Sequence, residues 1–63
     1  MKAKFEIFKD TGGQYRFRLR AENGEIIAAS EAYTTKANCR KGIASVKSNA
    51  PVAEIIDKTK KLR

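Results

Sequence analysis

QYRFRLRA, residues 14–21, alternates polar and apolar side chains without a break. A period of two is typical of a β-strand with one buried and one exposed face. The aromatic and aliphatic side chains then face the core, whereas Arg16, Arg18 and Arg20 project from the opposite face. The partners of this strand are expected directly before and after it in the sequence.

A strand is also expected at residues 4–8, KFEIF, before the turn residues 10–13, DTGG. The turn allows more than one register, and a slip of one residue would place the apolar side chains of the two strands on opposite faces. Three loop residues with Gly13 in the left-handed region fit a type I turn followed by a bulge. Burial should therefore select one register, in which Phe5 lies opposite Leu19 and Ile7 lies opposite Phe17.

The third strand is expected at residues 25–30, EIIAAS, after the dipeptide Asn23-Gly24. Asn-Gly is the preferred pair for a two-residue type I′ hairpin, in which both residues have positive φ. Such a turn sets the register of the second and third strands. The expected pairs are Glu22 with Glu25, Ala21 with Ile26, Arg20 with Ile27, Leu19 with Ala28, and Arg16 with Glu31.

The period becomes helical from Thr34 to Asn49. Thr34 or Thr35 can cap the N-terminus of this helix. At its other end Asn49 suits a left-handed position, and Pro51 is expected to push Ala50 out of helical geometry. One narrow apolar stripe can cover the sheet, formed by Cys39, Ile43, Val46 and Ala50.

These elements make an α+β domain of the form β-β-β-α-β, with an antiparallel sheet and one helix packed on a face. The closing strand is expected at Ala53–Asp57, and residues 58–63 form a basic C-terminal tail. The single domain thus spans residues 1–57. Its expected core on the sheet consists of Phe5, Ile7, Tyr15, Phe17, Leu19, Ala21, Ile26 and Ala28.

A domain of 63 residues is marginally stable alone, because it buries only about 60% of the surface of its unfolded chain. Disulfides within the chain are excluded, since Cys39 is the only cysteine. A zinc site is nearly excluded, because there is no histidine and one thiol cannot fill a tetrahedral shell. Oligomerisation remains as the way to stabilise so small a domain, and this elimination predicts a homodimer.

The absence of histidine also removes the usual general base of enzymes. The carboxylates, tyrosines and lone thiol show no spacing typical of a catalytic site, so we expect no enzyme and no cofactor. Residues 1–10 do not resemble a signal peptide, because charged side chains interrupt them. The longest apolar run is Ile26-Ile27-Ala28-Ala29, which is too short to span a membrane. With one unpaired cysteine, a cytoplasmic location is expected.

The formal net charge of +7 favours attraction to nucleic acid or another polyanion. A row of guanidiniums beside an aromatic ring suits a single-stranded nucleic acid. The candidate residues are Arg16, Arg18, Arg20, Phe8 and Lys4. In the alternative, these side chains form ordinary cross-strand pairs, with Glu6 opposite Arg18 and Glu31 opposite Arg16. We favour the alternative and expect only weak nucleic-acid binding, because Phe8 is the one aromatic residue on that face. The sequence does not identify a small-molecule ligand.

Three further residues have a structural and a functional interpretation. Cys39 lies near Lys36 and Arg40, which could activate a thiol, yet its place on the apolar stripe favours a core residue. Gly42 in mid-helix predicts a close approach to a neighbouring backbone. Tyr33 is expected to attach the helix to the sheet as a partly buried aromatic residue, and a place at the edge of a ligand site is the alternative.

The chain resembles the YegP-like family of small bacterial proteins, whose function is not established. The resemblance rests on FEIFKD at 5–10, GQYRFRL at 13–19, NGEIIA at 23–28, SEAY at 30–33, Lys36, Cys39, GI at 42–43, SVK at 45–47 and NA at 49–50. It implies β-β-β-α-β units that assemble in pairs, share a sheet and exchange their C-terminal strands. Because this chain has one such unit, the resemblance implies a homodimer. It implies no catalytic or ligand-binding residue.

Overall fold

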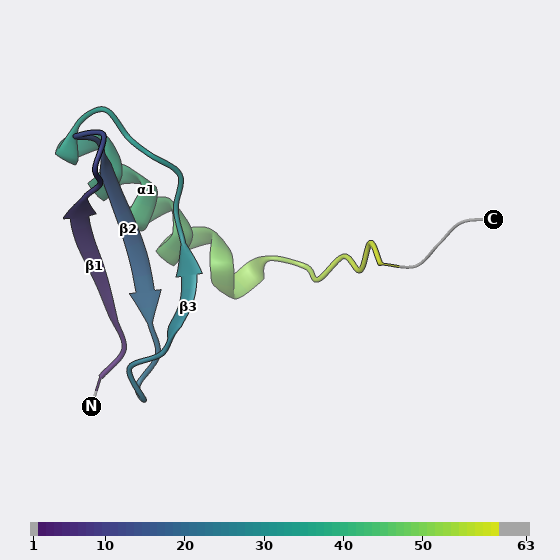
Figure 1. The fold of residues 1–63 in the computed structure, drawn as a ribbon. Coiled ribbons are helices and arrows are strands. Elements are labelled where there is room, and N and C mark those ends of the chain that lie inside the picture. The colour runs from purple at the N-terminus through teal and green to yellow at the C-terminus, as the bar shows by residue number, and fades with distance from the viewer. Residues whose placement is uncertain (1, 60–63) are drawn as a thin grey trace.

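The computed structural model describes residues 2–59, which form three antiparallel strands followed by one helix (Figure 1). The sheet order is β1-β2-β3, and α1 crosses the sheet behind β2. This α+β architecture and the order of its first four elements confirm the prediction. The elements are β1 (Lys4–Lys9), β2 (Tyr15–Arg20), β3 (Ile26–Ala29), α1 (Lys36–Asn49) and a short 3-10 helix, η1 (Ala50–Val52).

The first hairpin has the predicted register, with Phe5 opposite Leu19 and Ile7 opposite Phe17. The predicted turn is confirmed as well. The Gly13 amide donates to the Asp10 carbonyl over 3.0 Å, and Gly13 alone in this turn is left-handed, with φ of 83°. Glycine carries no penalty for this conformation, so the turn closes without strain.

The second turn is not the predicted type I′. The Gly24 amide donates to the Ala21 carbonyl over 2.9 Å, and Gly24 has φ of 89° while no other residue in the turn has positive φ. The second hairpin therefore repeats the first, with a three-residue loop ending in a left-handed glycine. Asn23 avoids the left-handed region and instead accepts a hydrogen bond from the Glu25 amide over 3.0 Å.

The extra loop residue is absorbed by a bulge in β3. Leu19 lies opposite Ala28 as predicted, but Arg20 lies opposite Ile26 rather than Ile27. The side chains of Ile26 and Ile27 are 51% and 61% exposed. The expected core residues Ile26 and Ala28 on this strand are therefore not buried.

The buried centre of the described chain is small, with Phe17 5% exposed and Cys39 fully buried. The Phe17 ring stacks on Tyr33 at 6.2 Å between centroids and meets the edge of Phe5 at 5.8 Å. The backbone of Tyr33 also exchanges two hydrogen bonds with Tyr15, of 2.7 and 2.8 Å. Tyr33 thus joins the chain before α1 to β2, as expected.

Gly42 allows α1 to approach side chains rather than a neighbouring backbone. A Cβ atom at Gly42 would lie 2.8 Å from Cζ of Tyr33 and 3.2 Å from Cε2 of Phe17, and closer still to the Tyr33 hydroxyl. The predicted close approach is confirmed, but its partner is the pair of stacked aromatic rings. Gly42 thus lets α1 lie close to Phe17 and Tyr33.

The ends of α1 only partly follow the prediction. The Thr35 hydroxyl accepts a hydrogen bond from the Asn38 amide over 3.0 Å, which identifies Thr35 as the cap. Asn49 is not left-handed, and Ala50 keeps helical angles of −56° and −42°. The helix tightens into η1 instead, because Pro51 stands in its first turn, where a missing amide proton costs little.

The expected closing strand at Ala53–Asp57 is not formed in the described chain. The segment leaves the domain past β3, on the side of the sheet away from β1 (Figure 1). Ile55 is 95% exposed and Ile56 is 66% exposed. A strand requires a neighbouring strand for its backbone hydrogen bonds, and this segment has none beside it. Residues 60–63 of the expected basic tail lie outside the described residues.

Candidate functional site

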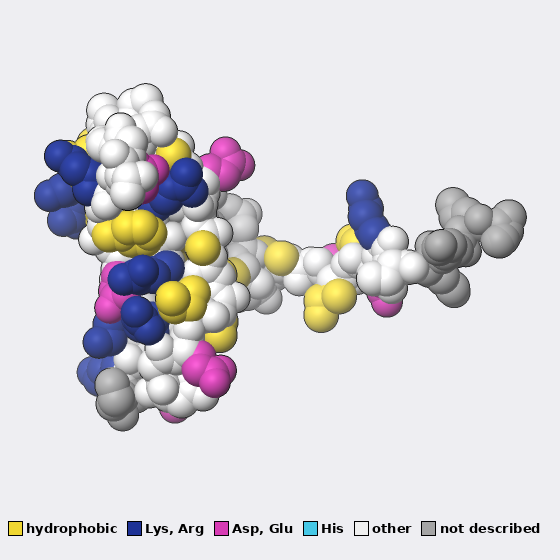
Figure 2. Space-filling view, viewed as in Figure 1, with side chains coloured by type: hydrophobic (Ala, Val, Ile, Leu, Met, Phe, Trp, Pro, Cys, Tyr) yellow, Lys and Arg dark blue, Asp and Glu magenta, His cyan; other side chains and the backbone are white. Residues whose placement is uncertain are grey.

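The sheet face opposite α1 carries a row of three arginines, Arg16, Arg18 and Arg20, which we call the arginine row. Figure 2 shows basic side chains on this face next to acidic and apolar ones. The neighbours on β1 are set by the register: Lys4 lies opposite Arg20, Glu6 opposite Arg18, and Phe8 opposite Arg16. The fold therefore gathers all five predicted site residues on adjacent strands.

Glu6 is held between two of these arginines. The Nε atoms of Arg18 and Arg20 both donate to Oε1 of Glu6 over 2.8 Å. Hydrogen bonds from Arg20 and then Arg18 lower the pKa of Glu6 from 4.5 to about 2. Arg20 also donates to the Gly24 carbonyl over 2.6 Å. The predicted pairing of Glu6 with Arg18 is confirmed, and Arg20 joins it.

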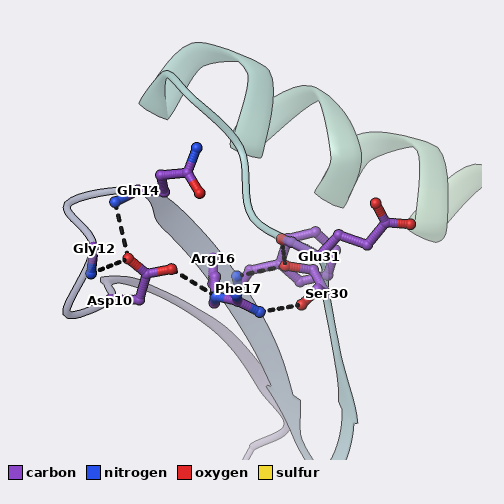
Figure 3. A network of polar contacts seen from close by, with 7 residues as sticks. All are labelled: Asp10, Gly12, Gln14, Arg16, Phe17, Ser30 and Glu31. Carbon is purple, nitrogen blue, oxygen red and sulfur yellow. Dashed lines mark hydrogen bonds and ion pairs between the residues drawn. The ribbon is translucent and has the colours of Figure 1, made fainter.

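Arg16 bonds to Asp10 rather than to Glu31, the expected partner. Its Nε donates to Oδ2 of Asp10 over 2.8 Å, and the other carboxylate oxygen accepts the amides of Gly12 and Gln14 at 2.9 Å (Figure 3). The hydrogen bond from Arg16 is the main reason that the pKa of Asp10 is lowered. The backbone bonds hold Asp10 in the turn with Oδ2 toward Arg16 on β2.

Phe8 interacts with Arg18, its diagonal neighbour across the two strands. The guanidinium carbon of Arg18 lies 4.6 Å from the centroid of the Phe8 ring, a cation–π geometry. Lys4 is the predicted residue least involved in this face, since it is exposed and stands at the end of β1. The carboxylates of Asp10 and Glu6 thus form ion pairs with the three guanidiniums of the arginine row, and the face keeps a net positive charge.

A groove between β1 and α1, on the other side of the sheet, was not anticipated from the sequence. Its volume is about 740 Å³, its floor is apolar, and its charged lining residues are all basic. The sequence does contain a signal for this groove, because Arg40 and Lys47 are seven residues apart and flank Ile43 on one side of a helix. The lining residues are Ala3, Lys4, Phe5, Ile7, Leu19, Arg40, Ile43, Ala44 and Lys47.

Two further findings concern residues 2–59 only. No three side chains among their cysteine and carboxylate groups lie close enough to ligate a metal ion. None of their helices has the length and apolar character that crossing a bilayer requires.

The lowered pKa of Glu6 predicts a loss of stability in acid. A carboxyl group whose folded-state pKa is depressed contributes stability above its unfolded value, here 4.5, and loses that contribution as the pH falls toward 2. The denaturation midpoint should therefore decrease over this range. Glu6→Gln should be less stable than the parent at neutral pH and show a shallower decrease in acid. An unchanged pH profile in Glu6→Gln would contradict the ion-pair geometry.

Comparisons with known proteins agree with this fold. A family model described as "Domain of unknown function (DUF1508)" matches residues 10–57. A UPF0339 protein of Methanosarcina acetivorans is 61% identical over 54 residues, covering 86% of this chain and 93% of that protein. UPF0339 protein YegP of Escherichia coli is 52% identical over 54 residues, which are 86% of this chain but 49% of YegP.

A solved structure supports the same relationship. The NMR solution structure of a protein from Haloferax volcanii matches with a TM-score of 0.83 and 47% sequence identity, and the match covers 89% of this chain and 95% of that one. The resemblance to YegP-like proteins that the sequence suggested is confirmed by these matches.

Proposed function

Because this chain belongs to the DUF1508 family, whose function is unknown, we propose its function from its geometry: it is a non-enzymatic, homodimeric binding module of the cytoplasm. The C-terminal segment, residues 53–57, is the part that joins two copies by strand exchange. One observation carries the proposal, namely the 95% exposure of Ile55 on a segment that pairs with no strand in the described residues.

The energetics favour a partner for this segment. Fully burying an isoleucine side chain contributes about 1.5–3 kcal/mol, and the exposed Ile55 and Ile56 forgo most of this in a single copy. The domain centre buries few residues fully, so it gains more than a large domain would from added apolar contacts. A second copy supplies the same segment and the same open sheet edges, which makes exchange self-complementary.

The chemistry of the side chains favours binding over catalysis. The sequence has no histidine, and its one thiol, on Cys39, is fully buried away from any substrate. Hydrogen bonds from the arginine row lower the pKa of Glu6 and of Asp10. A carboxylate with a lowered pKa is a poor general base at neutral pH. A free thiol is also stable in the reducing cytoplasm.

Deletion of the C-terminal segment tests the proposal. The full chain should sediment as a dimer at micromolar concentration, and a chain ending at Val52 should be monomeric and much less stable. A chain ending at Asp57 is the matched control, because it removes the basic tail alone and should remain dimeric. Sedimentation equilibrium that shows a folded monomer for the full chain would overturn the proposal.

A second candidate function is weak binding of single-stranded nucleic acid by the arginine row. The observation in its favour is that Glu6 serves both Arg18 and Arg20, so part of their charge remains available to phosphates. Phe8 adds one ring for stacking, although Arg18 already covers it. The ion pairs weigh against tight binding, because phosphate must compete with carboxylates already in place.

Salt dependence tests this second candidate. We expect sequence-independent binding at low salt that disappears near physiological ionic strength, with a log–log slope of about −0.7 for each phosphate contacted. Replacing Arg16, Arg18 and Arg20 by glutamine should weaken binding and flatten the slope, and trimming residues 58–63 should have a smaller effect. If binding survived physiological salt and was lost in the triple variant, nucleic-acid recognition would become the main function.

A further inference from the structure

We propose that the groove between β1 and α1 binds a small amphipathic anion, namely an aliphatic chain that ends in a carboxylate. The proposed ligand rests on the role of the protein as a binding module but not on its dimer, because one copy supplies every residue that lines the groove. The size of the groove, its apolar floor and the cations beside it all point to this class of ligand.

The groove exists because α1 covers the sheet unevenly. The helix runs obliquely across the back of the sheet and leaves it past β3 (Figure 1). The N-terminal half of β1, with Phe5 and Ile7, therefore borders an open space of about 740 Å³ beside the helix. Sites for small molecules are usually clefts of about 300–1,000 Å³. The groove thus has the size of a small-molecule site.

The floor of the groove is apolar and only partly covered. It is formed by Phe5, Ile7, Leu19 and Ile43, and each of these side chains is half-buried. A membrane-bound helix inserts a protruding apolar face into the bilayer, whereas these side chains lie at the bottom of a groove. A slender apolar chain can reach such a floor, and its binding would remove apolar surface of both molecules from water.

The charges beside this floor select an anion. Arg40 and Lys47 line the groove from exposed positions on α1, and no acidic residue lines it. α1 itself contains no acidic residue, and neither side chain forms an ion pair within residues 2–59. Their charges are therefore available to a ligand, unlike those of the arginine row, which are bonded to Glu6 and Asp10.

The spacing of the two cations fits an apolar chain with a carboxylate at one end. Arg40 and Lys47 are seven residues apart on α1, which is about 10 Å along the helix axis, and Ile43 lies between them. A chain that lies over Ile43 therefore has a cation near either end. Because a guanidinium can donate two parallel hydrogen bonds to a carboxylate, Arg40 is expected to be the stronger anchor.

A nucleic acid fits the groove less well than an aliphatic carboxylate. Single strands bind where several aromatic rings are exposed for the bases to stack on. Phe5 is the one aromatic residue that lines the groove, and the edge of its ring meets Phe17. The floor is otherwise aliphatic, which favours a hydrocarbon chain.

Titration of the full chain with decanoate, below its micellar concentration, tests the proposal. Calorimetry should show saturable binding that is at least about tenfold tighter than that of decanol, which lacks the charge, and no binding of decyltrimethylammonium. Lengthening the probe from octanoate to decanoate should tighten binding roughly three- to tenfold, because two more methylene groups are buried. In NMR spectra, decanoate should shift the amide signals of Phe5, Ile7 and Ile43 but not that of Ile27.

Charge reversal on α1 tests the location of the site. Arg40→Glu with Lys47→Glu should weaken decanoate binding at least about tenfold and should allow decyltrimethylammonium to bind instead. The matched control is Lys36→Glu with Lys41→Glu, an equal charge change at exposed positions of the same helix outside the groove. This control should bind decanoate nearly as tightly as the parent. Circular dichroism confirms that each variant keeps the fold.

The outcomes separate the ligand site from the dimer and from other partners. If decanoate binds as expected to a chain that sediments as a monomer, the groove assignment stands and the proposed dimer fails. If decanoate does not bind saturably, or if the two double variants lose binding equally, the assignment is wrong. It is also wrong if the chain binds phosphatidylglycerol vesicles but not decanoate, because the basic residues of α1 would then serve attachment to a membrane.

Discussion

Replacing Gly42 by alanine is expected to destabilise the fold by about 1–3 kcal/mol, the usual range for overpacking a core. In an ordinary helix the same change would stabilise by about 1 kcal/mol. Here the new methyl group would lie 2.8 Å from Cζ of Tyr33 and 3.2 Å from Cε2 of Phe17. The Tyr33 ring cannot easily move, because it stacks on Phe17 and its backbone is hydrogen-bonded to Tyr15.

Chemical denaturation measures this effect, and two variants define its cause. Ala44→Gly, at an unobstructed position of the same helix, should show the ordinary loss of about 1 kcal/mol. Gly42→Ala combined with Tyr33→Leu should be less destabilised than the sum of the two single changes, because the smaller side chain removes the clash. An increase in stability for Gly42→Ala alone would mean that α1 does not lie as close to the rings as the structure has it.

The register of the first hairpin could be predicted because the burial pattern selects one of the registers that the turn allows. The alternation in QYRFRLRA fixes which side chains are buried, and the DTGG turn fits the same pairing. In the second hairpin the signals differ. Asn23-Gly24 alone suggests a two-residue turn, but the structure uses only the left-handed glycine and places the surplus residue in β3.

The ion pairs show what a register can and cannot predict. Glu6 and Arg18 are directly opposite, so their contact followed from the pairing of β1 with β2. Asp10 reaches Arg16 from a turn, where its side chain is positioned by backbone amides rather than by strand alternation. Asp10 can be placed in a turn from the sequence, but its hydrogen bond with Arg16 cannot be predicted in the same way. That contact depends on three-dimensional geometry that periodicity does not describe.

The C-terminal segment is predicted least well, for a physical reason. Its residues Ile55 and Ile56 have the β-propensity of a strand, but propensity does not supply a hydrogen-bonding partner. In the described residues the segment pairs with no strand edge, so it does not form a strand. The groove beside β1 was missed for a related reason, because it is formed by Arg40 and Lys47 on α1 together with a strand distant in sequence.

Replacing Cys39 by aspartate is expected to unfold the domain at neutral pH. Cys39 is a fully buried residue of α1, and an unpaired carboxylate placed there costs several kcal/mol. This cost is comparable with the whole stability of about 3–5 kcal/mol that so small a core supplies. Cys39→Ala removes only a small apolar group and should cost about 1 kcal/mol. Cys39→Asn keeps the shape of aspartate without its charge, so its loss of stability should lie between those of Cys39→Ala and Cys39→Asp.

Circular dichroism and denaturation midpoints measure this series, and pH provides a further check. Burial raises the pKa of an aspartate, so the Cys39→Asp variant should regain structure as the pH is lowered from 7 toward 5, above the range in which the ion pairs of Glu6 are lost. In the unmodified protein a bulky thiol reagent should react slowly, at a rate limited by opening of the fold. Rapid labelling under native conditions, or a stable Cys39→Asp variant at neutral pH, would show that the side chain is exposed and would reopen the case for a reactive thiol.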